Sequence, residues 1–106
     1  MATHEEFSKI ELKIAKIISA ERIEGSEKLL KLKVTLGVEE RQIIAGIGRA
    51  YDPETLKEKE IVIVANLDPR SLMGLESQGM LLAASSENGP VLLVPDREVS
   101  PGSGIQ

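Results

Sequence analysis

An alternation of apolar and polar residues within positions 28–36 constrains the fold more than any other part of this sequence. Leucine or valine stands at every even position from 30 to 36, and the odd positions between them hold Lys31, Lys33 and Thr35. A side-chain period of two is typical of a β-strand with one face in a core and the other in solvent. The pattern therefore predicts a β-sheet whose buried face includes these aliphatic side chains.

The same alternation places Lys31 and Lys33 next to each other on the outer face of the strand, about 7 Å apart. This separation is comparable to that of successive phosphates along one nucleic-acid strand, so the two ammonium groups could contact a nucleic acid. Lysines also keep exposed strands soluble. The strand by itself leaves both interpretations open.

Short strand-like segments account for most of the remaining chain. They are residues 11–23, 41–48, 61–67, 80–84 and 91–94. In the first segment the alternation slips by one residue at positions 16–18, which predicts a β-bulge that bends the strand. Asp52 followed by Pro53 predicts one helical turn between the third and fourth strands. These features predict an all-β protein with the OB-fold, a five-stranded Greek-key barrel with that short helical turn, in a single domain over residues 1–106.

Both ends of the chain lie outside this barrel pattern. Thr3 and Glu6 have the spacing of a capping box, which predicts a short helix over residues 3–9. Phe7 is expected to anchor that helix to the core. The tail after Pro95 contains further proline and glycine and is predicted to be irregular.

Composition limits the functions that this chain can have. There is no cysteine, and His4, the single histidine, has no second ligand nearby, so we expect no metal site and no cofactor. No nucleophile stands beside a base, so we expect no catalytic residues and no enzyme activity. No apolar run is long enough for a membrane span and no secretory signal is visible, which favours a cytoplasmic protein. The net charge of -4 argues against nucleic-acid binding unless the cations gather on one face.

Residues 65–84 carry an unusual concentration of polar side chains between two apolar strands. Asn66, Arg70, Ser77 and Gln78 lie in this stretch, and proline and glycine interrupt it. Polar groups on a short segment between rigid strands are typical of a recognition site. Spacing alone does not separate that interpretation from a plain surface connection.

The motif Asn-Leu-x-Pro-Arg-x-Leu-Met-Gly-x-x-Ser-x-Gly-Met over residues 66–80 is long and specific. Together with residues 28–32, 7–14 and 99–102, it resembles the tRNA-binding domain found at the C-terminus of methionyl-tRNA synthetases and in freestanding bacterial tRNA-binding proteins. The endothelial monocyte-activating polypeptide contains a similar domain, and so does the small secretion chaperone of bacilli. The resemblance extends over nearly the whole chain, from Phe7 to Ile105.

The resemblance implies an OB-fold that binds the outer corner of tRNA by shape, and a homodimer for freestanding members. The Phe7 segment and the tail are the expected dimer interface. Carried over position by position, the binding face would consist of Lys31, Lys33, Asn66, Arg70, Met73, Ser77 and Gln78. Aromatic residues are only 2% of the chain, which favours recognition of folded RNA over base stacking of single strands.

Several alternatives stay open at this point. Ser71 stands where the family often has a basic residue, and the missing charge could weaken tRNA affinity. Residues 24–27 replace a commoner turn that contains proline and aspartate. A peptide-binding secretion chaperone is the alternative function, which the negative charge also favours. If tRNA is the ligand, the chain could be a freestanding protein, a separate subunit that assists a methionyl-tRNA synthetase, or an excised domain of such an enzyme.

Overall fold

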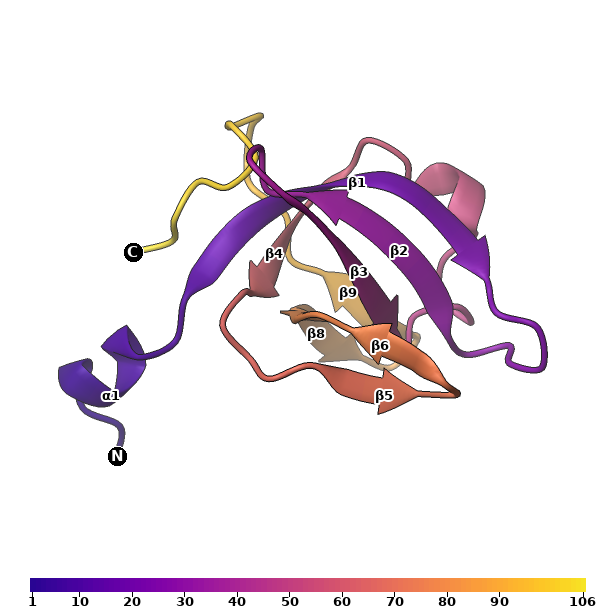
Figure 1. Ribbon diagram of the computed structural model, residues 1–106, viewed down its shortest axis with the longest axis horizontal. Helices are drawn as coiled ribbons and strands as arrows, with labels where there is room; N and C mark the ends of the chain where they lie inside the picture. The colour runs from indigo at the N-terminus through magenta and orange to yellow at the C-terminus, as the bar shows by residue number, and fades with distance from the viewer.

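The computed structural model describes residues 1–106 and is an all-β protein built around one curled antiparallel sheet (Figure 1). The strand order in the sheet is β3-β2-β1-β4-β7. The bounds of these strands are β1 Leu12–Arg22, β2 Leu30–Thr35, β3 Glu40–Ala45, β4 Glu60–Val64 and β7 Met80–Leu81. Two separate hairpins complete the strands, β5 Arg70–Leu72 with β6 Leu75–Ser77, and β8 Ala83–Ser86 with β9 Gly89–Leu92. The predicted OB-like fold class is confirmed.

β1 is the central strand and changes partners along its length. Its whole first half pairs with β4, and its second half pairs with β2. The register with β2 shifts between Ile17 and Ser19, close to the slip in the sequence pattern. The predicted bulge is thus confirmed, and a bulge bends a strand so that one sheet can curl around its own core.

The core has the composition that the alternation predicts. Leu30, Leu32 and Val34 of β2 are completely buried, and Lys33 between them is exposed. The helical turn η1, Pro53–Thr55, has Asp52 as its N-cap, with the Asp52 carboxylate accepting a hydrogen bond from the Glu54 amide. Leu56, directly after this turn, is also completely buried and packs in the same cluster as β2.

The predicted N-terminal helix forms, but it does not touch the core. Helix α1, His4–Ser8, has the complete capping box between Thr3 and Glu6. None of its residues is buried, and Phe7 is 51% exposed, so the expectation that Phe7 anchors the helix to the core is wrong. Figure 1 shows the reason, because the linker before β1 leads away from the barrel and α1 lies beyond its end.

The tail is irregular, as predicted, yet it is firmly attached to β1. The amide of Ile14 donates to the carbonyl of Ser103, and the amide of Gly102 donates to the carbonyl of Ile14. Gly102 has φ 92°, and a Cβ there would lie 2.2 Å from the carbonyl oxygen of Leu36, so only glycine fits. The tail therefore supplies a partner to the first half of β1, where β2 does not reach.

Several strand boundaries differ from the sequence prediction. β3 and β4 end at Ala45 and Val64, three residues before the expected ends at positions 48 and 67. Residues 80–84 form parts of β7 and β8, separated at Leu82, where a single strand was expected. The last strand is β9, which ends at Leu92, whereas residues 91–94 were expected to form it. No helix in the structure combines the length and the apolar character that crossing a membrane requires.

Candidate nucleic-acid interface

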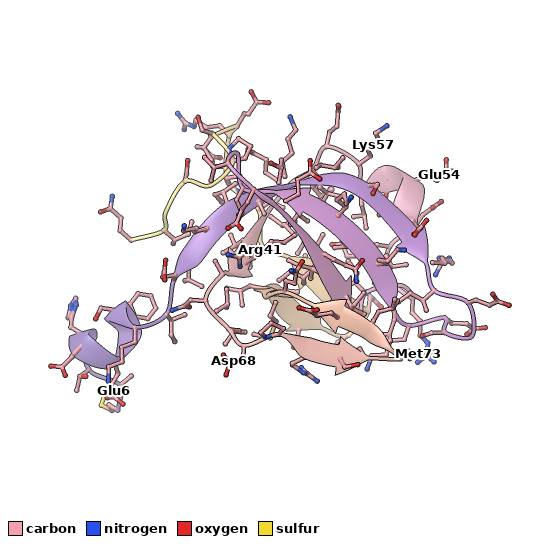
Figure 2. All side chains as sticks on the ribbon, viewed as in Figure 1. Glu6, Arg41, Glu54, Lys57, Asp68 and Met73 are labelled. Atoms are coloured by element: carbon pink, nitrogen blue, oxygen red, sulfur yellow. The ribbon has the colours of Figure 1, made fainter.

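Residues 70–77 form a hairpin in the stretch where the sequence predicted an irregular connection. β5 and β6 pair in register from Arg70 with Ser77 to Leu72 with Leu75, and Met73 and Gly74 form the tip (Figure 2). Both tip residues have positive φ, 50° for Met73 and 77° for Gly74. Two positive φ values are the geometry of the tight hairpin turn whose twist matches that of the strands.

Met73 at this tip has a backbone conformation that residues other than glycine rarely adopt. A methionine with positive φ costs of order 1–2 kcal/mol relative to glycine, so the surroundings must hold it there. Its side chain is 57% exposed. The terminal methyl carbon lies 3.6 Å from the position that a Cβ on Gly25 would occupy, so the tip rests on the turn between β1 and β2. The hairpin thus presents a partly exposed apolar side chain at a fixed place.

Arg70 lies on β5, is exposed, and forms no ion pair. It borders a small hollow together with Asp68, Leu72 and Met80. A guanidinium without a carboxylate partner keeps its planar set of donors for a ligand, and this set matches phosphate geometry.

Lys31 and Lys33 project from the outer face of β2, as predicted, but both are paired. The Lys31 ammonium lies 2.7 Å from a carboxylate oxygen of Glu21, and the Lys33 ammonium lies 3.8 Å from one of Glu40. Such exposed pairs contribute roughly 0–1 kcal/mol and are screened by salt. A phosphate would therefore compete with these carboxylates for the lysines.

One continuous surface connects these lysines with the hairpin. Gln42 on β3 is the register partner of Lys33, and residues directly opposite in an antiparallel pair project to the same side. The Gln42 side-chain amide donates a 2.8 Å hydrogen bond to the carbonyl of Glu76 in β6. The outer face of β2 therefore continues across β3 onto the hairpin.

Ser77 and Gln78 hold the hairpin to the edge of β3. The Ser77 hydroxyl accepts a hydrogen bond from the amide of Ile44 and donates one to the carbonyl of Gly79, both at 3.0 Å, and Ser77 is only 4% exposed. Gln78 accepts at its side-chain oxygen from the amide of Gln42 at 2.9 Å. These side-chain bonds attach the hairpin to β3 together with the backbone bond from the Gln78 amide to the Gln42 carbonyl at 2.8 Å.

Asn66 is also engaged within the protein. Its side-chain amide donates to the carbonyl of Lys9 at 2.6 Å, and its side-chain oxygen accepts from the amide of Glu11 at 2.8 Å. The structure thus brings Arg70, Met73 and Ser77 together in one hairpin, with Gln78 next to it and Asn66 at its base. The role of these residues in binding tRNA stays a prediction.

Comparison with protein families identifies what this arrangement is similar to. The model of the tRNA binding domain family matches residues 12–104. The chain belongs to this family. The resemblance drawn from the 66–80 motif is thereby confirmed.

Individual relatives agree with this assignment. The methionine–tRNA ligase of Caldanaerobacter subterraneus subsp. tengcongensis is 54% identical over 103 residues, which are 97% of this chain and 16% of that protein. The ligase of Archaeoglobus fulgidus is 45% identical over 95% of this chain and 15% of its own length. The chain thus spans about one sixth of the curated relatives that it matches.

Two solved structures with the same fold cover the whole chain. A methionyl-tRNA-synthetase-related protein from Pyrococcus horikoshii is 38% identical with a TM-score of 0.93, covering 100% of this chain and 98% of its own. The chaperone CsaA from Bacillus anthracis is 30% identical with a TM-score of 0.92, covering 100% and 99%. The fold of this tRNA-binding domain is therefore shared by a synthetase-related protein and a chaperone.

Sequence reasoning missed the part that Arg41 plays in this tRNA-binding domain. Its guanidinium donates to the carbonyl of Ala65 and, at 3.4 Å, to that of Gln78, and it pairs with Glu39 at 2.9 Å (Figure 2). Arg41 thus fixes both ends of the hairpin segment to β3. No local signal could reveal this role, because the bonded residues are 24 and 37 positions away in the sequence.

The second missed feature is an open hollow of about 650 Å³ beside the hairpin tip. Its charged lining consists of Arg22, Arg49, Glu24 and Glu27, and the Gly48 carbonyl accepts a 2.9 Å hydrogen bond from Arg22. The hollow holds equal numbers of positive and negative side chains, so its electrostatic preference is weak. Its cations were invisible to motif reasoning because they are separated along the chain.

Proposed function

We propose that this chain is a structure-specific tRNA-binding module that acts as an accessory domain or subunit of an aminoacyl-tRNA synthetase, the methionyl-tRNA synthetase. The observation that supports this most directly is the family match over residues 12–104, combined with a hairpin that presents an unpaired Arg70. The relatives that bear the name methionine–tRNA ligase support the choice of synthetase. The catalytic part of that enzyme is the proposed protein partner.

The proposed contacts follow from the exposure and pairing of each side chain. Arg70 contacts a phosphate through its guanidinium, and Met73 contacts a ribose or a base at the hairpin tip. Lys31 and Lys33 contribute longer-range attraction once the backbone phosphates displace their carboxylate partners. Asn66, Ser77 and Gln78 act mainly by positioning this surface, because their polar atoms already form hydrogen bonds inside the protein.

Recognition by shape agrees with the small number of aromatic side chains. Tyr51 accepts a hydrogen bond at its hydroxyl from the amide of Leu92 and packs against the core, so it offers no platform for a base. Folded RNA can be bound through phosphates and 2′-hydroxyls without such a platform. We propose no chemical step for this chain, whose contribution would be to raise the concentration of tRNA near the synthetase in the cytoplasm.

We also propose that the chain forms a homodimer through its N-terminal helix. Phe7 and Ile10 are large apolar residues that this chain leaves exposed, and Ile105 of the tail is exposed as well. A second copy related by a twofold axis would cover Phe7 and Ile10 and double the surface offered to tRNA. A mass near 11.5 kDa by light scattering, the monomer value, would contradict the dimer.

The function is tested by a gel shift with tRNA at two salt concentrations, using an unstructured RNA of equal length as competitor. We expect retention of tRNA that weakens as salt rises and resists the competitor, because phosphate contacts release counterions while the competitor lacks the folded shape. Absence of any shift at low salt would contradict the proposal.

A chaperone that binds unfolded peptides is the second candidate, supported by the likeness to CsaA. Exposed apolar side chains such as Val91, Leu93 and Val94 could contact an unfolded chain. Suppression of aggregation of a denatured test protein at equimolar concentration would favour this function. Failure to suppress it, together with a positive gel shift, would remove it.

A further inference from the structure

The N-terminal arm, defined here as residues 1–11, has very few connections to the barrel. Helix α1 contains no buried residue, and the hydrogen bonds of residues 3–8 stay within the arm. Three hydrogen bonds join the end of the arm to the start of the hairpin segment, at Ala65 and Asn66. The position of α1 therefore depends on these few bonds.

The Asn66 side chain provides two of the three. It donates to the carbonyl of Lys9 at 2.6 Å and accepts from the amide of Glu11 at 2.8 Å, so it joins both sides of Ile10. The third is the backbone bond from the Ala65 amide to the Glu11 carbonyl at 2.8 Å. A terminal amide has a donor and an acceptor on one carbon, which is what these two opposite backbone groups require.

We propose that Asn66 is a positioning residue that holds the N-terminal arm against the barrel and thereby acts on tRNA binding through the dimer. This inference rests on the proposed function, in which the arm forms the dimer interface and tRNA is the ligand. It gives Asn66 a different role from Arg70, although both belong to the same motif. Arg70 offers an unpaired guanidinium to the ligand, whereas the amide of Asn66 is occupied inside the protein.

The first test measures the attachment of the arm directly. Amide hydrogen exchange at Glu11 is compared between the wild type, Asn66→Ala and Asn66→Asp, with Asn88→Ala as control. Asn88 is an exposed asparagine in the β8–β9 turn whose side chain forms no hydrogen bond. We expect exchange at Glu11 to become roughly tenfold faster in Asn66→Ala, because the bonds from both its acceptor and its donor disappear.

Asn66→Asp separates the two bonds. An aspartate keeps an oxygen that can accept from the Glu11 amide, but it cannot donate to the Lys9 carbonyl. Exchange at Glu11 should therefore change less than in Asn66→Ala, while the arm is still released at Lys9. Equal exchange rates in all variants and the control would overturn the inference, since the arm would then be held without Asn66.

The second test separates positioning from direct contact with RNA. tRNA retention is measured at a dilute and at a concentrated protein solution for Asn66→Ala and Arg70→Ala, and the dimer is followed by light scattering over the same range. We expect the Asn66→Ala dimer to be weaker, so that it is already dissociated in the dilute solution in which the wild type is still a dimer. In the concentrated protein solution the variant should form the dimer again and recover tRNA binding. Arg70→Ala should stay dimeric and remain impaired at both concentrations. Loss of binding by Asn66→Ala at both concentrations, without loss of the dimer, would show direct contact and overturn the inference.

Failure of the proposed function can be distinguished experimentally from failure of the inference about Asn66. If the wild type retains no tRNA, or scatters as a monomer, the proposed function fails while the Glu11 exchange experiment still decides whether Asn66 holds the arm. If the wild type binds tRNA as a dimer and Glu11 exchange is unaffected by Asn66→Ala, the inference fails alone. Thermal unfolding of each variant confirms that the barrel itself is intact, and we expect Asn66→Ala to unfold within a few degrees of Asn88→Ala.

Discussion

The outer face of β2 and the β5–β6 hairpin both offer cations to solvent, but the two regions are held in different ways. β2 lies between two neighbouring strands and buries three aliphatic side chains completely. The hairpin has only three residues in each strand and is fixed to β3 by the side chains of Arg41, Ser77 and Gln78. Apolar burial thus positions Lys31 and Lys33, whereas polar bonds between distant residues position Arg70.

The two regions also differ in the ion pairs that their cations form. The well-anchored Lys31 and Lys33 both have carboxylate partners, and Arg70 in the smaller hairpin has none. Apolar packing of β2 therefore contributes most to the stability of the barrel, whereas the hairpin offers a cation that is free to contact a ligand. Substitutions on the buried face of β2 should mainly change the free energy of unfolding, and substitution of the exposed cation of the hairpin should mainly change tRNA affinity.

The largest effect is expected when the buried face of β2 is altered. Leu32→Ala should lower the free energy of unfolding by about 2–5 kcal/mol, because it removes completely buried methyl groups and leaves a cavity. Denaturant unfolding measures this change. Lys33→Ala, on the opposite face of the same strand, is the matched control and should change stability little while weakening tRNA binding. A comparable loss of stability in both variants would break the division between the two faces.

Removal of a buried polar side chain at the base of the hairpin should have the next largest effect. Ser77→Ala removes the acceptor for the buried amide of Ile44, and an unpaired buried donor costs about 1–3 kcal/mol. Denaturant unfolding should show this loss, and gel shifts should show weaker tRNA binding because the hairpin is less firmly held. Ser85→Ala, at an exposed serine whose side chain forms no hydrogen bond, should leave both quantities unchanged. If Ser77→Ala behaves like Ser85→Ala, polar bonds do not position the hairpin.

The contrast between these regions also explains which parts of the structure could be predicted from the sequence. The strand at residues 30–35, the bulge in β1 and the helical turn at Asp52 were predictable because each depends on local periodicity or capping. The β5–β6 hairpin was missed because each strand has only three residues, too few for a periodic pattern, and Pro69 and Gly74 directly before and between them suggested a loop. The contacts of Ser77 and Arg41 with residues more than 20 positions away have no local signal. Phe7 was assigned to the core on hydrophobicity alone, although the direction of its linker leaves it exposed.

Removal of the unpaired cation in the hairpin should change affinity without changing stability. Arg70→Gln should weaken tRNA binding by roughly tenfold at low salt and reduce the slope of log affinity against log salt by about 0.7–0.9, the value for one lost phosphate contact. Gel shifts over a salt series measure both quantities. Lys57→Gln is the control with the same charge change, since Lys57 also lacks an ion pair and lies far from the hairpin (Figure 2). An equal change in both variants would show that net charge, and not a contact at Arg70, governs binding.

The smallest effect is expected from releasing a lysine of β2 from its partner. Glu21→Gln removes the carboxylate 2.7 Å from the Lys31 ammonium, so tRNA affinity should rise by about twofold to threefold while stability falls by less than about 1 kcal/mol. Glu54→Gln causes the same change of net charge at η1, on the opposite side of the barrel from Met73 (Figure 2). A larger increase for Glu21→Gln than for Glu54→Gln at low salt would show that the ion pair restrains Lys31. Equal increases would mean that Lys31 contributes only through the overall field of the protein and not through a direct contact with the ligand.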